Sequence, residues 1–469
     1  MYSHDVKIQV DKDLASVAET RPWQFSLPRF FFFPYGIPKW QDSSPLASCM
    51  YGVPEKLRKP NKEAYIPQAV VIGPIHRKNK ELMQLNKKHY YDHFFNPSPW
   101  QEKSKLDRIK KDRDQLEQKA RELAQEARKC YQFEIGLEAE PFVTMLLVDG
   151  IFILEFLLRK CSLKRADHPD ERNIFEKPSL RGDILYDLIL IENQLPFFVL
   201  KGLYETYYNS SRGWEEFLYK VANEYFTTGV TLENAKTAVE TCNIRHLADF
   251  LHALCMVSIS SKYKNCYPKK FDQFSRSATE LRKAGVQFEK ADNNLPFDVV
   301  FSKDEGVLKF PPLVVNRWTE YFFRNFIAHE DHIHTEKIIS SYIILMGSLL
   351  NSSEDVDLLV ARGIIENKSL RTSEEVSRLI KNLYNRSMMC YSDFFYASLC
   401  DDLNKYSKDD WHRWRSSWYK WKEILKSEYF SSPWSIISVI VAFVILLLTL
   451  IQTASSVIPY FNPGWSKLG

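Results

Sequence analysis

The sequence predicts a mainly α-helical protein: a large helical body with a small antiparallel β meander and one C-terminal transmembrane helix. Three observations lead to this fold class. Apolar residues recur at helical spacing along most of the chain, and three short β-type stretches lie between turn residues. No charged residue lies between Ser431 and Lys467. With 469 residues, the chain can bury a sizeable core as one unit or two.

Composition divides the chain into four parts. The N-terminal residues have neither the form of a signal peptide nor an apolar run long enough to span a bilayer. The predicted parts are a variable, partly disordered segment at 1–45, a helical body at 46–430, a transmembrane helix with its flanks at 431–458 and a short tail at 459–469.

The first half of the body reads as long helices. Apolar residues from Leu106 to Cys130 alternate three and four apart, with Arg113 as the single break, which predicts an amphipathic helix. The following stretch, PFVTMLLVDGIFILEFLLRK, is apolar on nearly every side and predicts a buried helix that starts near Pro141. A second buried helix is expected over Asp183 to Leu200, broken or kinked near Pro196.

The β-type stretches follow a short helix that Gly285 is expected to end. They read VQFE, DVVFS and VLKFP, and Asn, Asp, Gly and Pro separate them, which predicts a small antiparallel meander. Helical spacing resumes at Asn316 and continues to about Tyr429.

The uncharged stretch predicts a single-pass membrane anchor. From Trp434 to about Ile458 it has the roughly 20 apolar residues that a spanning helix needs, so we expect residues 434–458 to contact the lipid bilayer. Cations are abundant before this stretch and only Lys467 follows it, which favours a cytosolic body. Four glycosylation sequons, at Asn209, Asn351, Asn367 and Asn385, would instead suit a lumenal body.

Composition also excludes some classes of function. A net charge of +4 on a chain of this size does not indicate a nucleic-acid binder. The eight cysteines form no CxxC pair and no metal-ligand spacing, so we expect free thiols in a reducing compartment, with no metal and no cofactor. The oligomeric state is left open.

Six ordered blocks carry a family resemblance. They are IPQAVVIGPIHR, MLLVDGIFILEFLL, DLILIENQLPFFVL, ATELRKAGVQFE, LKFPPLVVNRWTEYFFRNFIAHE and DVDLLVARGIIEN. From about Met50 onward the chain resembles the plant UPF0481 proteins, which are defined by the domain of unknown function 247. The resemblance implies a plant source, a single membrane span and no established enzymatic activity. Some relatives are associated with pollen self-incompatibility loci in grasses, which implies recognition or signalling.

The chain departs from that family's pattern at two places. Ile75, His76 and Arg77 replace a tyrosine and paired histidines, and the segment His329–Asp331 replaces a phenylalanine, a glutamate and a glutamine. His332 and His334 lie next to the second departure. Histidines and carboxylates can bind zinc, but their order here is one residue short of HExxH, so we expect a solvated or locally hydrogen-bonded cluster instead.

Several polar residues interrupt the apolar helices. They could do acid–base chemistry, but we expect them to pair across helices and fix the packing, because an unpaired buried charge is costly. The Glu-Asn-Gln run is expected to bind backbone groups freed at the Pro196 kink. The candidates for this polar latch are Asp149, Glu155, Glu192, Asn193, Gln194 and the i,i+4 pair Glu320 and Arg324.

An aromatic face precedes the anchor. It either packs on the body or lies at the membrane interface while neighbouring cations meet anionic lipid. This juxtamembrane face comprises Trp411, Trp414, Trp418 and Trp421.

The sequence shows no phosphate-binding loop, GxGxxG motif or GxSxG elbow. We therefore expect a membrane-tethered interaction protein with a protein or peptide partner, and not an enzyme. Two alternatives stay open: an enzyme of unknown chemistry with a buried carboxylate site near Asp149 and Glu192, and a structural membrane scaffold.

Overall fold

The computed structural model describes the body in segments. The predicted N-terminal segment at 1–45, the aromatic face and the tail at 459–469 lie outside the described residues, as do His334 and the sequon Asn385. The described residues are 49–77, 87, 91, 103–161, 177–209, 213–226, 230–259, 275–292, 296–333, 337–368, 372–384, 394–408, 441–442 and 444–453.

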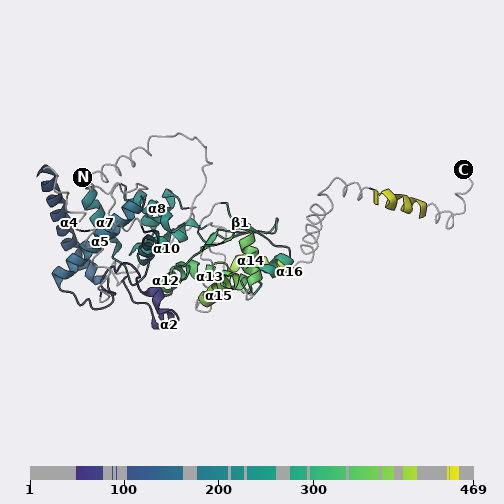
Figure 1. Cartoon of the computed structure of the whole chain (residues 1–469), viewed down its shortest axis with the longest axis horizontal. Coiled ribbons are helices and arrows are strands. Elements are labelled where there is room, and N and C mark those ends of the chain that lie inside the picture. Colours follow the sequence, from purple (N-terminus) through teal and green to yellow (C-terminus); the bar gives the residue numbers. More distant parts are fainter. Residues whose placement is uncertain are drawn as a thin grey trace, which may run out of the picture.

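The fold is mainly helical, as predicted (Figure 1). The elements of the first half are α2 (Glu55–Arg58), η1 (Lys62–Tyr65), α4 (Lys103–Lys129), α5 (Ala139–Cys161), α6 (Pro178–Asp187), α7 (Phe197–Tyr208), α8 (Trp214–Tyr225), α9 (Leu232–Thr241) and α10 (Leu247–Ser258). The second half contains α11 (Ala278–Lys283), β1 (Gln287–Lys290), β2 (Val300–Ser302), β3 (Val307–Phe310), β4 (Leu313–Val315), α12 (Thr319–His332), α13 (Ile338–Leu349), α14 (Ser353–Ala361), β5 (Ile365–Asn367), α15 (Ser373–Tyr384) and α16 (Ala397–Lys408).

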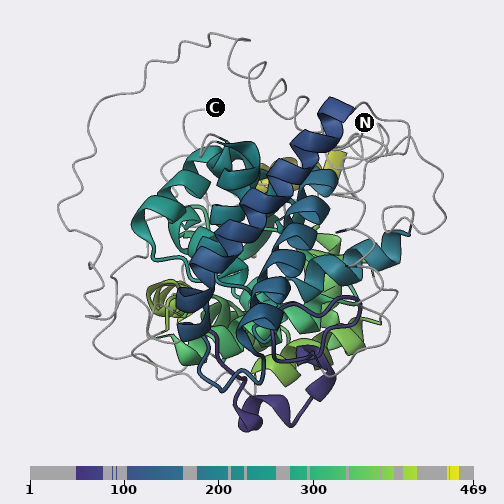
Figure 2. The same ribbon diagram turned by 90° about the vertical axis from the view of Figure 1, so that its left-hand side faces the viewer.

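Helices α4, α7 and α8 pack around α5. Helix α4 lies along α5 and α7 (Figure 2), and α5 also contacts α8. The amphipathic prediction for α4 is confirmed, because Leu116, Ala120 and Ala127 are buried. The prediction of a buried α5 is confirmed as well. Among the residues described, α5 is the one helix long and apolar enough to cross a membrane, but 83% of its apolar window is buried inside the body. Composition alone therefore does not distinguish this core helix from a membrane span.

The predicted break near Pro196 is confirmed, but the prediction that one helix extends from Asp183 to this break is wrong. Helix α6 ends at Asp187, a buried non-helical segment follows at 188–196, and Pro196 is the N-cap of α7. The break is stable because side-chain amides bind carbonyls of this segment. Asn193 Nδ2 donates to Asp187 O at 2.9 Å, and Gln194 Nε2 donates to Leu188 O at 2.7 Å.

The predicted antiparallel meander is also wrong in its topology. The three β-type stretches form β1, β2 and β3, but the strand order is β1-β3-β2. Strand β2 pairs antiparallel with β3, whereas β1 pairs with the other edge of β3 in parallel. The sequence missed a second sheet, in which β4 pairs in parallel with β5. This pairing interrupts the stretch that was expected to be helical from Asn316 onward.

Helix α12 joins the two halves. It contacts η1 and α10 of the first half, and α13 and α15 of the second half, and Figure 1 shows it between the two groups of helices. Its side chains at Phe323, Phe326 and Ala328 are buried. Polar residues on α12 can therefore reach both halves.

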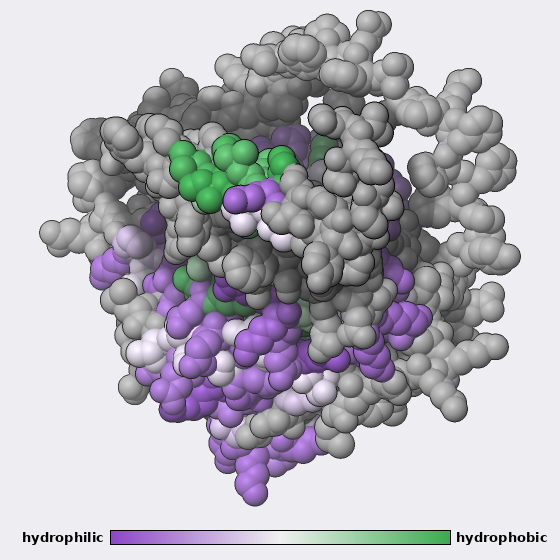
Figure 3. Space-filling model, turned by 90° about the vertical axis from the view of Figure 1, so that its right-hand side faces the viewer, coloured by the Kyte–Doolittle hydropathy of each residue, from purple (hydrophilic) through white to green (hydrophobic). Residues whose placement is uncertain are grey.

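A further apolar helix, Val444–Thr453, lies beyond α16 (Figure 1). Its large apolar side chains are between 43% and 61% exposed, and Figure 3 shows them as a green patch. In the described part of the chain before residue 441, Val360 is the one large apolar side chain that is exposed. The body thus buries its apolar residues, while this helix does not.

Candidate functional site: the polar network beneath the N-terminal strap

The candidate site lies under the segment Met50–His76, which we call the N-terminal strap. Apart from α2 and η1 the strap is extended or turn-like, so much of its backbone has no helical or sheet partner. Side chains from other elements supply those partners. The buried residues that bind it are Asp149, Asp187, Glu192, Asn193 and Asn325.

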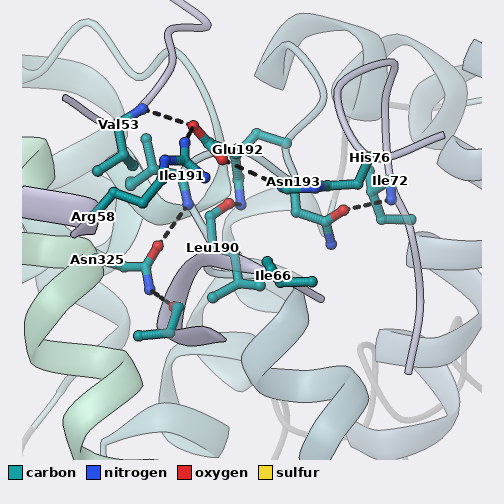
Figure 4. A network of polar contacts seen from close by, with 12 residues as sticks. Val53, Arg58, Ile66, Ile72, His76, Leu190, Ile191, Glu192, Asn193 and Asn325 are labelled. Carbon is teal, nitrogen blue, oxygen red and sulfur yellow. Dashed lines mark hydrogen bonds and ion pairs between the residues drawn. The ribbon is translucent and has the colours of Figure 1, made fainter. Parts of the chain in front are cut away.

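Glu192 holds the first part of the strap (Figure 4). Its Oε1 accepts a hydrogen bond from Val53 N at 2.7 Å and pairs with the Arg58 guanidinium. Its Oε2 lies 3.4 Å from His76 Nε2. Burial alone would raise the pKa of Glu192, but the contacts with His76, Val53 N and Arg58 lower the pKa below its usual value. Glu192 therefore acts as an ionised acceptor.

Asp187 and Asn193 hold the middle of the strap. Asp187 accepts hydrogen bonds from three successive backbone N–H groups, those of Gln68, Ala69 and Val70, at 2.6 to 2.8 Å. Burial raises the pKa of Asp187 to about 7, and the three N–H donors act against that rise. The Asn193 side chain both accepts a hydrogen bond from the strap and donates one to it. Its Oδ1 accepts from Ile72 N at 2.7 Å, and its Nδ2 donates to Val70 O at 3.0 Å.

Asp149 holds the end of the strap. It accepts from Gly73 N at 2.9 Å and forms an ion pair with Lys87, which also donates to Val71 O at 2.6 Å. Gly73 has φ of +68°, and a Cβ there would lie 2.8 Å from Gln194 O, so only glycine fits this close approach. Glu155, by contrast, pairs with Arg159 one turn along its own helix.

Helix α12 contacts the same strap. Asn325 donates to Ala64 O at 2.8 Å and accepts from Ile191 N at 3.1 Å, so it links the strap to the 188–196 segment (Figure 4). Glu320 accepts from Arg324 Nε at 2.8 Å and from Asn61 Nδ2 at 2.9 Å. The structure therefore brings Glu192, Asn193, Asp149 and Glu320 to one strap, although they come from distant parts of the chain.

Gln194 binds backbone at the helix break, the role that the sequence suggested. Its Nε2 donates to Leu188 O at 2.7 Å and to Leu190 O at 2.9 Å, and its Oε1 accepts from Ala248 N at 3.4 Å. All three bonds are buried. They fix the 188–196 segment against α10.

We expect Gln194→Leu to lower the melting temperature by roughly 5 °C, because two buried carbonyls would lose their donors at about 1–3 kcal/mol each. Thermal unfolding followed by circular dichroism measures this. The control is Gln68→Leu, since the Gln68 side chain makes only an exposed bond, to Ile66 O at 3.1 Å. Equal melting temperatures for wild type and Gln194→Leu would contradict the latch.

A second cluster, centred on His329, lies beside the start of the strap. His329 Nδ1 lies 2.6 Å from the Tyr51 hydroxyl, and His329 Nε2 lies 3.0 Å from Asp249 Oδ1. Asp249 also accepts from Arg245 Nε at 2.9 Å. The four side chains form a continuous row from the strap through α12 to α10.

The charges in this row can be assigned. Burial alone would raise the pKa of Asp249, but the His329 hydrogen bond and the Arg245 charge hold it well below its usual value. Burial lowers the pKa of His329, so its ring is neutral. Because an ionised Asp249 can only accept, His329 carries its proton on Nε2, and Tyr51 donates to Nδ1. Burial raises the pKa of Tyr51, which keeps that hydroxyl protonated.

Glu330, the residue after His329, binds helix α13 in the second half of the body. Its two oxygens accept from Ile339 N at 2.8 Å and Ser340 N at 2.7 Å, in the first turn of α13, where a carboxylate is favourable. His252 Nε2 lies 2.8 Å from Glu330 Oε1. His332 stacks on Tyr51 with ring centroids 3.5 Å apart.

The expectation of a solvated or local histidine cluster is corrected here. His329 and Glu330 are fully buried, and their partners come from α10 and the strap. No group of three or more histidine, cysteine or carboxylate residues with metal-binding geometry occurs within the described ranges. Sequence reasoning missed Asp187, Asp249, His252 and Asn325. Asp249 and His252 are polar residues in the apolar helix α10, the same signal that identified Asp149, whereas Asp187 and Asn325 lie in the mixed helices α6 and α12.

Comparison with known proteins identifies one family of plant proteins. A family model described as "plant protein of unknown function" (DUF247) matches residues 50–448. A UPF0481 protein of Arabidopsis thaliana is 26% identical over 444 residues, which cover 88% of this chain and 87% of that protein. A putative UPF0481 protein of the same plant is 21% identical over 524 residues, covering 88% and 90%. No solved structure matches the chain significantly.

Proposed function

The chain belongs to the DUF247 family of plant proteins of unknown function, and we propose that it is a membrane-tethered interaction protein. In this proposal, the apolar C-terminal helix inserts into a bilayer. The helical body presents a surface to a protein or peptide partner in recognition or signalling.

The exposed apolar helix is the observation that supports the proposed membrane tether. Residues 444–453 turn seven large apolar side chains outward, and each is more than two-fifths exposed. Soluble proteins rarely leave so continuous an apolar patch in water. The charge-free sequence extends beyond this helix on both sides and reaches the length that a single span needs.

The proposed role of the body in binding, and not in catalysis, is supported by how its carboxylates are used. Asp149 is bonded to Gly73 N and Lys87, and Glu192 Oε1 is bonded to Val53 N and Arg58, while Glu192 Oε2 lies 3.4 Å from His76 Nε2. A catalytic carboxylate must contact its substrate, whereas these acceptors already bind groups of the same chain. We propose that both groups stabilise the fold.

Membrane fractionation tests the tether. We expect the full-length protein to pellet with membranes and to be released only by detergent. Leu447→Arg combined with Leu450→Arg should move it to the soluble fraction, because each arginine at the centre of a span costs about 2.5–3.5 kcal/mol. Val360→Arg is the control, since this 40% exposed residue lies in the body. A soluble wild-type protein, or a double variant that still pellets, would refute the tether.

The same membranes report which side the body faces. The cations before the apolar stretch support a cytosolic body. Asn209, Asn351 and Asn367 are exposed, so a lumenal body would present them for glycosylation. Glycosidase treatment should leave the mobility of the protein unchanged. A mobility shift would place the body in the lumen.

A further inference from the structure

Two cysteines lie side by side where the strap begins. Met50 pairs with Tyr131 in a parallel bridge: Met50 N donates to Cys130 O at 2.8 Å, and Gln132 N donates to Met50 O at 3.0 Å. Cys49 and Cys130 are the preceding residues of the two segments, so they lie opposite each other. Residues paired in a parallel bridge are about 4.8 Å apart, so residues directly beside the bridge should fall near the Cα range of about 4.4–6.8 Å that a disulfide requires.

We propose that Cys49 and Cys130 form a reversible disulfide that fastens the start of the strap to the end of α4. This inference does not rest on the membrane tether. Tyr51 lies two residues after Cys49 and donates to His329. The disulfide would therefore hold the strap closed over the His329 row.

The two thiols are close enough to change each other's pKa. Their mutual contact lowers the pKa of Cys130 and raises the pKa of Cys49, and burial acts to raise both. Opening of the strap separates the two thiols, so either one can then be the attacking thiol and the other the resolving thiol.

The oxidant that we assign is a small disulfide, oxidised glutathione. The thiolate of one of the two cysteines attacks one of its sulfurs and displaces one glutathione thiolate. The other cysteine then loses its proton to solvent, attacks the protein sulfur of the mixed disulfide and displaces the second glutathione. The two protein thiols lose two electrons and two protons, and one glutathione disulfide becomes two glutathione molecules. Excess reduced glutathione reverses both steps.

Access to the pair requires the strap to open locally, because Cys49 is 7% and Cys130 is 1% exposed. Once formed, the bond encloses the chain from residue 49 to residue 130. Closing so long a loop restricts the unfolded chain and stabilises the fold.

The test incubates the full-length detergent-solubilised protein with mixtures of reduced and oxidised glutathione. Remaining thiols are then alkylated under denaturing conditions, and the peptides are mapped by mass spectrometry. We expect Cys49 and Cys130 to be lost from the alkylated pool together, to appear in one cross-linked peptide pair, and to return when reduced glutathione is added. The oxidised protein should melt roughly 5–10 °C higher than the reduced protein.

Cys49→Ser and Cys242→Ser are the matched variants, since Cys242 is a half-buried cysteine elsewhere in the chain. Cys49→Ser should abolish the cross-linked pair and the rise in melting temperature, whereas Cys242→Ser should retain both. The proposal is overturned if both cysteines remain alkylatable in fully oxidised glutathione. It is equally overturned if Cys130 cross-links mainly to another cysteine.

Discussion

Asp249→Asn is expected to destabilise the body by about 3–5 kcal/mol. The substitution keeps the side-chain volume but removes the charge that binds Arg245 and His329. Asp249 is buried and Arg245 is 28% exposed, so the substitution would leave a partly buried guanidinium charged and without this partner, which is a costly case. Since whole domains unfold with about 5–15 kcal/mol, the loss should be plain in urea titrations followed by circular dichroism.

The matched control is Glu374→Gln. Glu374 pairs with Arg378 at the same i,i+4 spacing as Arg245 and Asp249, but both side chains are more than 65% exposed. Removing an exposed pair should cost less than about 0.5 kcal/mol. If the two substitutions cost the same, the row through His329 would not stabilise the fold.

The pH dependence of the free energy of unfolding distinguishes the contribution of the Asp249 charge from the contribution of its packing. Its pKa in the folded protein is held well below the usual value of about 3.9. Below pH 4 the unfolded chain therefore binds a proton that the folded protein does not. The contribution of the ionised Asp249 to stability is therefore present above pH 4 and is lost as the pH falls below that value. The difference between wild type and Asp249→Asn should shrink below pH 4, and a constant difference would indicate packing alone.

Glu192→Ala should release the first part of the strap and cost about 2–4 kcal/mol. It removes the acceptor of Val53 N and the partner of Arg58, both of which lie on the strap. Hydrogen–deuterium exchange should become faster at Val53. The amide of Ile72, which binds Asn193, should change less.

Lys56→Ala is the control for the strap. Lys56 lies in α2 and forms a largely exposed ion pair with Asp331 at 3.2 Å. It should leave both the stability and the exchange of Val53 nearly unchanged. Val53 exchange that stays slow in Glu192→Ala would show that the strap is held without this carboxylate.

Local sequence patterns predicted the elements of the fold better than their connections. The three–four spacing of Leu116, Ala120 and Ala127 identified α4, and the uninterrupted apolar run identified α5. Turn residues located β1, β2 and β3. The sequence could not give their order, because which edge of β3 receives β1 depends on where the connecting chain runs.

The sequence predicted which type of residue forms the candidate site, but it did not predict the hydrogen-bond partners of those residues. A carboxylate or amide in an apolar segment must find a hydrogen-bond partner, so Asp149, Glu192 and Gln194 could be identified as structural polar residues. The partners of Asp149 and Glu192 could not be identified, because the strap reaches these two residues from more than 70 residues away in the chain.

By itself, then, the sequence determined the helical class, the buried α5, the positions of three strands and the charge-free C-terminal stretch. Each depends on residues within a few turns of one another, whose spacing decides which face is apolar. Only the tertiary structure decided that the chain leaves the helix at Asp187, that β1 joins β3, and that Tyr51 meets His329 across 278 residues. Such contacts depend on closure of the whole chain around one core, which no local spacing encodes.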